Sequence, residues 1–303
     1  MEKAALTPEL VSRLLAAQFP QWAGLNVERV ALDGWDNTSF RLGDELVVRL
    51  PSADAYAAQV DKEHRWLPVL APHLPLPVPE PVARGVPQPG FSRPWSVYRW
   101  LPGEHATLQQ VRELRRFATD LADFLAALSR VDPAGGPTPG RHNFFRGGPP
   151  TTYDREAREA IAALEGELDA VAATAVWEAA LAARWHGPAV WVHGDVTASN
   201  LLVVDGRLSA VVDFGCSAVG DPACDTAIAW TFFAGDSRAA FRERLPVDDA
   251  TWARGRGWAL WKALVTLVAE LDGRPGSESA HVRMGWRFDA RGVIEEVLAD
   301  HAA

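Results

Sequence analysis

The 303-residue sequence predicts an α+β protein of two lobes, a small β-rich lobe followed by a larger, mainly helical lobe. Short segments of alternating apolar residues with turn signals between them are concentrated before residue 101. Helical spacing of apolar residues prevails after it. The Pro102-Gly103 pair interrupts both patterns, so we expect a boundary near 100–104 and lobes of residues 1–100 and 101–303.

In the first lobe, two segments have the apolar spacing of amphipathic helices, 6–19 and 54–70. The Pro-dense stretch 72–82 should be extended, because proline cannot continue a helix. The expected strands are 27–32, 38–42, 46–50 and 95–101.

In the second lobe, one helix has its buried face marked by apolar residues at helical spacing: Leu114, Phe117, Leu121, Phe124, Leu125 and Leu128. A Gly/Pro-rich loop is expected over 133–150, one or two Ala-rich helices over 154–183, and mainly helix over 222–303. The expected strands are 189–192, 201–204 and 208–212. Asp205-Gly206 predicts a tight hairpin between the last two.

The composition limits the classes of protein to which this sequence can belong. The net charge of −9 argues against a non-specific nucleic-acid binder. No apolar run reaches about 18 residues, so no membrane helix is expected. The N-terminus lacks the apolar core of a signal peptide. The two cysteines, Cys216 and Cys224, form neither a disulfide framework nor a metal-ligand pattern, which favours a cytoplasmic location.

The acidic excess is uneven. Residues 1–100 carry 10 basic and 11 acidic side chains, whereas residues 101–303 carry 20 and 28. This excess is either simple solvation or a field that attracts a cationic ligand. The basic residues are 27 arginines and only 3 lysines, so an arginine can stand where a lysine is expected.

The segment "HGDVTASN", 193–200, places polar residues beside apolar runs. A turn would explain each polar residue singly. However, the hairpin at Asp205-Gly206 would bring Asn200 and Asp213 to the same end, and oxygen ligands of this kind suit Mg²⁺. Asp195 then remains as a separate carboxylate that can orient and deprotonate a hydroxyl, as phosphoryl transfer requires.

These residues resemble the catalytic core of the protein-kinase-like superfamily, in which H-R-D-x₄-N precedes D-F-G. Gly194 replaces the arginine, and this H-G-D variant is typical of the aminoglycoside phosphotransferase family. "GDPACDTA", 220–227, is similar to a second stretch of that family, whereas "TAS" at 197–199 departs from its usual "HPG". The resemblance implies a two-lobed protein-kinase-like fold, with a nucleotide-binding N-lobe and a catalytic, substrate-binding C-lobe.

The resemblance also implies roles in nucleotide binding. The segment 32–42 is similar to the loop that covers the phosphates, with Asp36, Asn37 and Thr38 as candidate contacts. Arg49 stands where the family carries a lysine for the α- and β-phosphates, and Glu63 is expected to pair with it. Lys62 is expected on a solvated helix surface.

Further roles follow from the same resemblance. Backbone groups of Arg99, Trp100 and Leu101 would bind adenine. His193 is expected to brace the catalytic loop, and Asp225 to bond its backbone. Asp221 either does likewise or faces the substrate.

The expected function is therefore transfer of the γ-phosphate of ATP (or GTP) to a hydroxyl of a small molecule. Asp195 acts as the base, and Asn200 and Asp213 hold Mg²⁺. The acidic second lobe favours an aminoglycoside-type polycation, with candidate contacts at Asp154, Asp221, Glu270, Asp272, Glu295 and Glu296.

Three alternatives remain. Trp230, Trp252, Trp258 and Trp261 have core-like spacing, but if they line a pocket, a macrolide or another bulky acceptor fits. A small metabolite alcohol such as choline, homoserine or methylthioribose is also open. A non-catalytic nucleotide-binding module is the alternative from another class. A protein kinase is disfavoured, because only four residues separate Gly215 from Gly220, too few for an activation loop.

Overall fold

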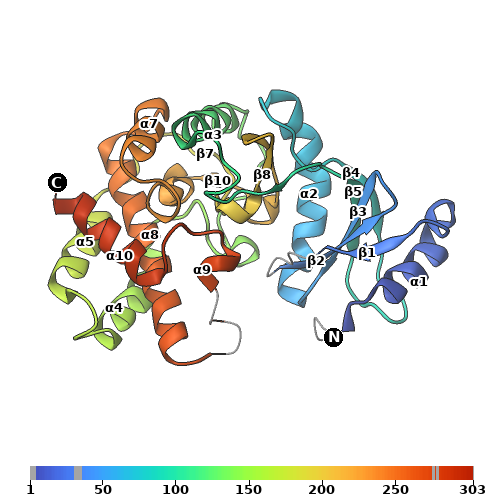
Figure 1. Ribbon diagram of the computed structural model, residues 1–303, viewed down its shortest axis with the longest axis horizontal. Helices are drawn as coiled ribbons and strands as arrows, with labels where there is room; N and C mark the ends of the chain where they lie inside the picture. The colour runs from blue at the N-terminus through green and yellow to red at the C-terminus, as the bar shows by residue number, and fades with distance from the viewer. Residues whose placement is uncertain (1–4, 31–35, 275–276, 278–279, 303) are drawn as a thin grey trace. The chain divides into compact units, whose positions relative to one another are not determined.

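A computed structural model describes residues 5–30, 36–274, 277 and 280–302 (Figure 1). The chain forms two compact units. The first comprises Met1–Pro72, Pro77–Pro102 and Val211–Gly215, and the second comprises His73–Leu76, Gly103–Ala210 and Cys216–Ala303. Asp213 therefore belongs to the first unit, although it is far along the chain.

The first unit is built on an antiparallel five-stranded sheet with the order β1-β2-β3-β5-β4. Asn37 to Leu42 pair with Leu46 to Pro51 across a tight turn in which Gly43 has φ 56°. The strands are β1 (Val27–Arg29), β2 (Asn37–Leu42), β3 (Leu46–Pro51), β4 (Pro81–Gly85) and β5 (Trp95–Arg99).

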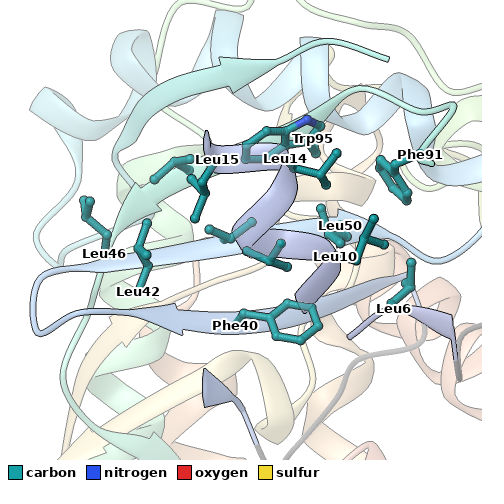
Figure 2. Packing of buried hydrophobic residues seen from close by; sticks show 13 residues of the cluster. Leu6, Leu10, Leu14, Leu15, Phe40, Leu42, Leu46, Leu50, Phe91 and Trp95 are labelled. Carbon is teal, nitrogen blue, oxygen red and sulfur yellow. The ribbon is translucent and has the colours of Figure 1, made fainter. Parts of the chain in front are cut away.

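Helix α1 (Pro8–Gln18) covers one face of this sheet (Figure 2). The helix begins where the Thr7 hydroxyl accepts a hydrogen bond from the Leu10 N–H and Pro8 occupies the first turn. Its apolar stripe packs on alternate strand residues, such as Val48 and Val97, which are fully buried. This contact forms the core of the first unit.

Strand alternation places the polar residues on the opposite face. Val48 pairs with Val97 on the apolar face, so the neighbouring positions Arg49 and Tyr98 must point to the other face. Helix α2 (Ala57–Leu70) contributes Glu63 to the same group, because the Glu63 carboxylate contacts both side chains. The sheet thus separates an apolar core from a buried polar cluster.

The second unit is mainly helical. Helix α8 is its longest and packs against α5, α10 and α4, and α3 packs against α7. The helices are α3 (Leu114–Leu128), α4 (Asp154–Ala163), α5 (Ala170–Ala182), α6 (Ile228–Thr231), α7 (Asp236–Arg244), α8 (Asp249–Leu271), α9 (Ala280–Arg283) and α10 (Ala290–Ala302). Two small sheets accompany them, β10 with β7 and β6-β8-β9. Their strands are β6 (Glu104–His105), β7 (Val190–Val192), β8 (Leu201–Val204), β9 (Arg207–Val211) and β10 (Ala218–Gly220).

The hairpin predicted from Asp205-Gly206 is confirmed. Strands β8 and β9 are neighbours, and both turn residues have positive φ, 52° for Asp205 and 79° for Gly206. Asn200 directly precedes β8, and Asp213 lies two residues beyond β9. The hairpin therefore fixes where these two residues leave the sheet.

Some sequence expectations need correction. The Ala-rich segment 154–183 is two helices, α4 and α5, since Gly166 with φ 87° breaks it. The strand predicted over 27–32 is described only to Arg29, and 31–32 lie outside the described residues. Strands β4, β6 and β10 were not predicted, because they are short or begin at proline. Within the described residues, no helix has the length and hydropathy to cross a membrane.

Candidate active site

The loop after β7 is held in one conformation by its own backbone. Gly194 has φ 84°, and a Cβ atom there would lie 2.4 Å from the Cys216 carbonyl oxygen and 3.0 Å from the Arg146 Cβ. Only glycine fits this position without strain. The tight approach explains why the H-G-D stretch carries glycine between its two polar residues.

The Asp225 carboxylate supports the same loop. Its carboxylate accepts hydrogen bonds from the backbone N–H groups of His193 and Gly194, both at 2.7 Å. Burial raises the pKa of Asp225, while the His193 ring and the two N–H groups act in the opposite direction. The contacts expected for Asp225 are thus present.

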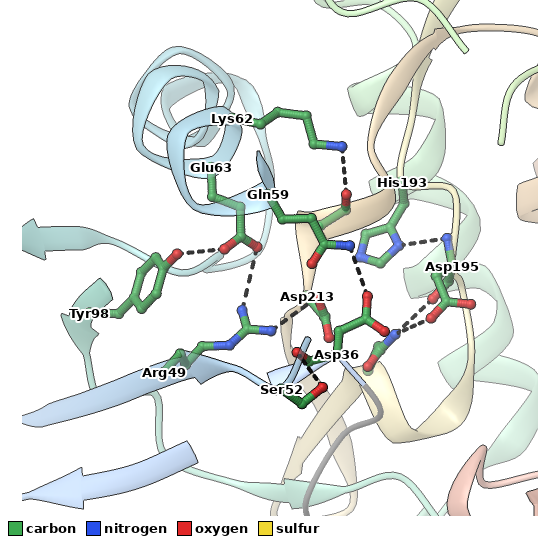
Figure 3. A network of polar contacts seen from close by, with 12 residues as sticks. Asp36, Arg49, Ser52, Gln59, Lys62, Glu63, Tyr98, His193, Asp195 and Asp213 are labelled. Carbon is green, nitrogen blue, oxygen red and sulfur yellow. Dashed lines mark hydrogen bonds and ion pairs between the residues drawn. The ribbon is translucent and has the colours of Figure 1, made fainter. Parts of the chain in front are cut away.

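Asp195 is half-buried in the same loop. Its backbone N–H donates to His193 Nδ1 at 3.2 Å, so the fully buried His193 ring braces the backbone. Asn200 Nδ2 donates to the Asp195 carbonyl oxygen at 2.9 Å and to Asp195 Oδ2 at 3.2 Å (Figure 3). The Asp195 carboxylate forms no ion pair with another described residue, which leaves Oδ1 available to a ligand.

The polar cluster of the first unit centres on Arg49. The Arg49 guanidinium lies 3.4 Å from Glu63 Oε1 and 3.0 Å from Asp213 Oδ1, and Tyr98 donates its hydroxyl to Glu63 Oε2 at 2.5 Å (Figure 3). Burial by itself would lower the pKa of Arg49, but the carboxylates of Asp213 and Glu63 raise it. Arg49 is therefore a fixed positive charge clamped by two acids.

Asp213 adopts an unusual backbone conformation. Its φ of 67° is rare for a residue with a side chain and marks local strain. This conformation accompanies the contact of its carboxylate with Arg49. Strained backbone of this kind concentrates at functional sites.

The expectation for Lys62 is wrong. The side chain is buried, with 8% exposed, and Nζ donates to the Gly215 carbonyl oxygen at 2.5 Å. Gly215 ends the 211–215 segment that carries Asp213. Lys62 therefore secures that segment to α2 instead of facing solvent.

The segment expected to cover the phosphates is described in part, because 32–35 lie outside the described residues. The Asp36 carboxylate accepts a hydrogen bond from Gln59 Nε2 at 2.8 Å, and the Asp36 carbonyl oxygen accepts from the Ser52 hydroxyl. Asn37 and Thr38 are buried, with 8% and 0% exposed. The Thr38 hydroxyl has no hydrogen-bond partner among the described residues, and its contact with a nucleotide stays a prediction.

The three residues expected to bind adenine differ in whether the backbone N–H group is available to a ligand. The Arg99 N–H donates to the Glu80 carbonyl oxygen and the Trp100 N–H to the Glu45 carbonyl oxygen, at 3.0 and 2.7 Å. The Leu101 backbone forms no hydrogen bond with another described residue. Of the three N–H groups, only that of Leu101 is available to a ligand.

The acidic residues expected to bind a cationic acceptor are engaged elsewhere. Asp221 is buried, and both carboxylate oxygens bind Arg254, at 2.6 and 3.0 Å, so its described partners do not include the backbone of the 193–200 loop, and its position does not face a substrate. The others lie at helix surfaces: Asp154 with Arg158 and Trp177, Glu270 with His281, Asp272 with Arg274, Glu296 with Arg238, and Glu295 exposed on α10.

A pocket lies beside Asp195 within the second unit, and its empty space is about 440 Å³ when the adjoining open solvent is counted. None of the six acidic candidates lines it. Its wall is mainly aromatic and apolar, and Asp195 is its one acidic residue. The lining residues are Arg146, Gly194, Asp195, Val196, Thr197, Cys224, Ala227, Thr231, Trp258, Ala259, Trp261, Lys262, Met284 and Trp286.

Sequence reasoning missed most of this wall. Trp258 and Trp261 were noted but their spacing favoured the core, whereas Trp230 and Trp252 do form core, with ring centroids 4.6 Å apart. Arg146 lies in the Gly/Pro-rich loop, where no periodic signal exists. The usable signal was the spacing of Trp258 and Trp261, three residues apart on α8 and next to Lys262, because it places both rings on one face of the helix.

The described residues contain no cluster of three or more His, Cys, Asp or Glu side chains that could hold a metal by themselves. Each of the two expected ligands, Asn200 in the second unit and Asp213 in the first, nevertheless has the oxygen donor that suits a hard cation. The Asn200 amide nitrogen is used by Asp195, so its Oδ1 oxygen remains free as a ligand. Asp213 supplies a carboxylate that is partly exposed.

Comparisons with known proteins agree with this geometry. A family model described as "Phosphotransferase enzyme family" matches residues 27–258. No curated protein matches the sequence significantly.

Solved structures show the same fold at low identity. The GDP complex of wild-type aminoglycoside 2′-phosphotransferase-IIIa is 20% identical, with a TM-score of 0.70 over 97% of this chain and 99% of the other. The streptomycin–ATP–APH(2″)-IIa ternary complex is 19% identical, with a TM-score of 0.59 over 95% and 99%. The macrolide 2′-phosphotransferase MphH from Brachybacterium faecium is 23% identical, with a TM-score of 0.57 over 91% and 97%.

The fold is thus the α+β, kinase-like fold of these enzymes, with an antiparallel sheet in the N-terminal part and a mainly helical C-terminal part. The family model covers well over half of the chain, and the chain belongs to the phosphotransferase enzyme family.

Proposed function

We propose that this protein transfers the γ-phosphate of ATP (or GTP) to a hydroxyl group of a small molecule. One observation carries the proposal. Asp195 presents a carboxylate without an ionic partner among the described residues, at the wall of a pocket and on a loop braced by His193 and Asp225. A positioned carboxylate of this kind is the part that accepts a hydroxyl proton in phosphoryl transfer.

The first unit would bind the nucleotide. Arg49 is held by Glu63 and Asp213, so its guanidinium is pre-positioned to contact phosphate oxygens without searching for a conformation. The free Leu101 N–H offers a hydrogen bond to the base. The solved relatives contain GDP and ATP, which supports a nucleotide as the donor without selecting between the two.

Asp213 and Asn200 would hold Mg²⁺. When bound, this ion neutralises the negative charge of the phosphates. The free Asn200 Oδ1 and the partly exposed Asp213 carboxylate are the oxygen donors that such an ion requires.

The chemical step then needs one proton acceptor. The acceptor hydroxyl gives its proton to Asp195 Oδ1, since Oδ2 already accepts from Asn200. Its oxygen forms a bond to the γ-phosphorus, and the bond from that phosphorus to the bridging oxygen breaks. The nucleoside diphosphate leaves, and the acceptor becomes a phosphate monoester.

The acceptor class is open to direct test. One relative was crystallised with streptomycin, and another is a macrolide phosphotransferase, so polycations and bulky apolar alcohols both belong in the test set. A protein located in the cytoplasm, as we propose, would encounter acceptors of both classes. A screen should measure nucleoside diphosphate release across aminoglycosides, macrolides and small metabolite alcohols, with Asp195→Ala as the blank.

We expect acceptor-dependent release from the wild type and almost none from Asp195→Ala, with nucleotide binding retained. A non-catalytic nucleotide-binding module would instead show no acceptor-dependent release at all. Full activity of Asp195→Ala would contradict the proposed role of the carboxylate.

A further inference from the structure

We propose that the acceptor of this enzyme is anionic, with an apolar body, and that Arg146 binds its carboxylate or an equivalent anionic group. This inference rests on the proposed function, because it assigns the substrate class of the same pocket. It differs from the polycation suggested by the acidic second lobe.

The first argument is the state of Arg146 itself. Its side chain is 9% exposed, and Nη1 is buried without a hydrogen-bond partner. Among the described residues, the guanidinium makes no hydrogen bond and no ion pair. A buried charge without a partner is costly, and an anionic ligand would offset that cost.

The second argument is a comparison within the same unit. Arg254 is also buried, with 2% exposed, but its guanidinium binds both oxygens of Asp221. This is how the fold treats an arginine whose role is structural. Arg146 lacks such a carboxylate, and it lines a pocket instead of lying in the core.

Neighbouring acids form no ion pair with Arg146 among the described residues. Glu156 accepts a hydrogen bond from Trp261 Nε1 at 2.7 Å, and Asp225 accepts from the backbone of the 193–200 loop. Asp195 Oδ2 accepts from Asn200, and Oδ1 is the atom proposed to accept the hydroxyl proton. The carboxylate that would complete the Arg146 site is therefore not supplied by these residues, and we assign it to the ligand.

The third argument is the shape and charge of the wall. The Arg146 guanidinium lies over the rings of Trp258 and Trp261, 5.0 and 5.1 Å from the centroids, and Trp286 also lines the pocket. An aromatic wall of this kind favours a ligand with an apolar body. The contact with two rings restrains the guanidinium group and uses none of its N–H donors, which suits a charge-assisted contact with an anion.

Lys262 adds a second cation to the same wall, with Nζ 6.0 Å from the Trp261 ring centroid. The lining thus holds two cations and a single acid, Asp195. A polycation would be repelled by Arg146 and Lys262, whereas an anion would be attracted. The overall charge of the lobe is a poor guide here, because local charges decide binding.

Arg146 is also placed to act on the hydroxyl's position. Its Cβ lies close to Gly194, the residue before Asp195, and the loop around it is fixed by Asn143 Nδ2, which donates to the Arg146 carbonyl oxygen at 2.9 Å. An anion bound at Arg146 would therefore set the distance from the reacting hydroxyl to Asp195. This favours a compact acceptor.

The test uses matched acceptors that share a ring and a hydroxymethyl group and differ in one substituent. Para-hydroxymethyl benzoate, benzamide and benzylamine form such a set, and the same set on a two-ring framework covers larger acceptors. Kanamycin serves as the polycation. Binding is measured by calorimetry without nucleotide, and phosphorylation is measured with ATP and Mg²⁺.

We expect at least one carboxylate to bind about tenfold or more tightly than its amide, as one charge-assisted contact predicts, and the amine to bind worst. Arg146→Gln should abolish this preference, and Arg146→Lys should keep part of it. Arg155→Gln is the matched control, because Arg155 is 86% exposed on α4 and its loss should change nothing. Melting curves confirm that each variant folds.

Two results would overturn the inference. One is binding of amines or kanamycin in preference to all the carboxylates, or no binding of any carboxylate. The other is a uniform loss of kcat in Arg146→Gln for every acceptor with KM unchanged, which would assign Arg146 to the transferred phosphoryl group. Carboxylates that bind through Arg146 but are never phosphorylated would instead contradict the proposed function and leave this binding site standing.

Discussion

At the scale of single residues, charge pairing decides which side chains are fixed and which are free for a ligand. Arg49 is held by two carboxylates, whereas Asp195 has no ionic partner among the described residues. In the proposed function, the first arrangement would pre-position a phosphate contact, whereas the second would leave a base open to an incoming hydroxyl. The same criterion is the basis on which we propose Arg146 as a binding residue and Arg254 as a structural one.

Glu63→Gln tests the Arg49 clamp. The amide keeps an acceptor for the Tyr98 hydroxyl but removes the charge that faces Arg49. Because Asp213 still compensates part of the buried guanidinium, we expect a loss of about 2 kcal/mol in unfolding free energy. We also expect a clear rise in KM for the nucleotide.

Denaturant unfolding and steady-state kinetics measure the two effects of Glu63→Gln. Asp61→Asn is the control, since its ion pair with Arg84 is solvent-exposed and should contribute under about 1 kcal/mol. Equal effects from the two substitutions would mean that the buried pair is not special.

Gly194→Ala tests the geometry of the catalytic loop. The positive φ and the contact with Cys216 leave no room for a methyl group, so the loop must shift. Because the shift moves Asp195, kcat should fall by tenfold or more, from a strain of about 1–2 kcal/mol at this residue. Calorimetric nucleotide binding should change little.

Gly24→Ala is the matched control for this substitution, because a Cβ atom there meets nothing within 4 Å. Unchanged turnover in Gly194→Ala would show that the loop tolerates a shift and that its tight backbone is not needed for catalysis.

At the scale of elements, local signals predicted the structure wherever the deciding interaction is local. The apolar spacing of residues 6–19 predicted α1, and Asp205-Gly206 predicted the β8–β9 hairpin, because helical spacing and turn chemistry involve neighbouring residues. Lys62 could not be predicted as buried, since its partner Gly215 is 153 residues away. Arg146 was missed because it lies in a loop without a periodic signal, and the rings that it contacts, Trp258 and Trp261, belong to α8.

The acidic candidates illustrate the limit most clearly. From the sequence, Glu296 and Glu270 could only be counted as charges, because their ion-pair partners Arg238 and His281 come from other elements. Net charge thus predicted a cationic ligand, whereas the charged residues that line the pocket are the basis on which we propose an anionic one. The tryptophans were ambiguous because the same helical spacing serves a core and a pocket lining.

Gly257→Ala in α8 tests the packing between helices. In an exposed helix this change adds about 1 kcal/mol of stability. Here the new Cβ would lie 2.4 Å from the Ala180 Cβ of α5, so we expect destabilisation instead. Thermal unfolding measures the sign directly.

Ala180→Gly supplies the second arm of a double-mutant cycle. The Gly257→Ala/Ala180→Gly protein should recover part of the stability that Gly257→Ala loses, because the clash is removed. Simple additivity of the two single changes would contradict a direct contact between these helices.

At the scale of the whole molecule, two histidines make stability depend on pH. Burial lowers the pKa of His64, an effect increased by Arg84 and opposed by Asp61, and burial lowers the pKa of His105, opposed by the Ser199 backbone. The unfolded chain therefore binds protons that the folded chain resists. Stability should fall as the pH drops below the ordinary histidine value of about 6.5.

Unfolding midpoints between pH 8 and pH 5, about the range in which histidine titrates, check this prediction. His105→Gln should flatten the dependence, because the buried Nδ1 of His105 lacks a hydrogen-bond partner among the described residues. A midpoint that rises on acidification through this range would contradict the assignment.

The central claim is that Asp195 directs phosphoryl transfer to the hydroxyl of a small molecule bound in the adjoining pocket. The most direct measurement is phosphorus NMR of an accepted substrate after incubation with ATP, Mg²⁺ and either the wild type or Asp195→Asn. We predict a phosphate monoester signal with the wild type and its near absence with Asp195→Asn, at equal nucleotide affinity. A monoester formed at a similar rate by Asp195→Asn would contradict the account.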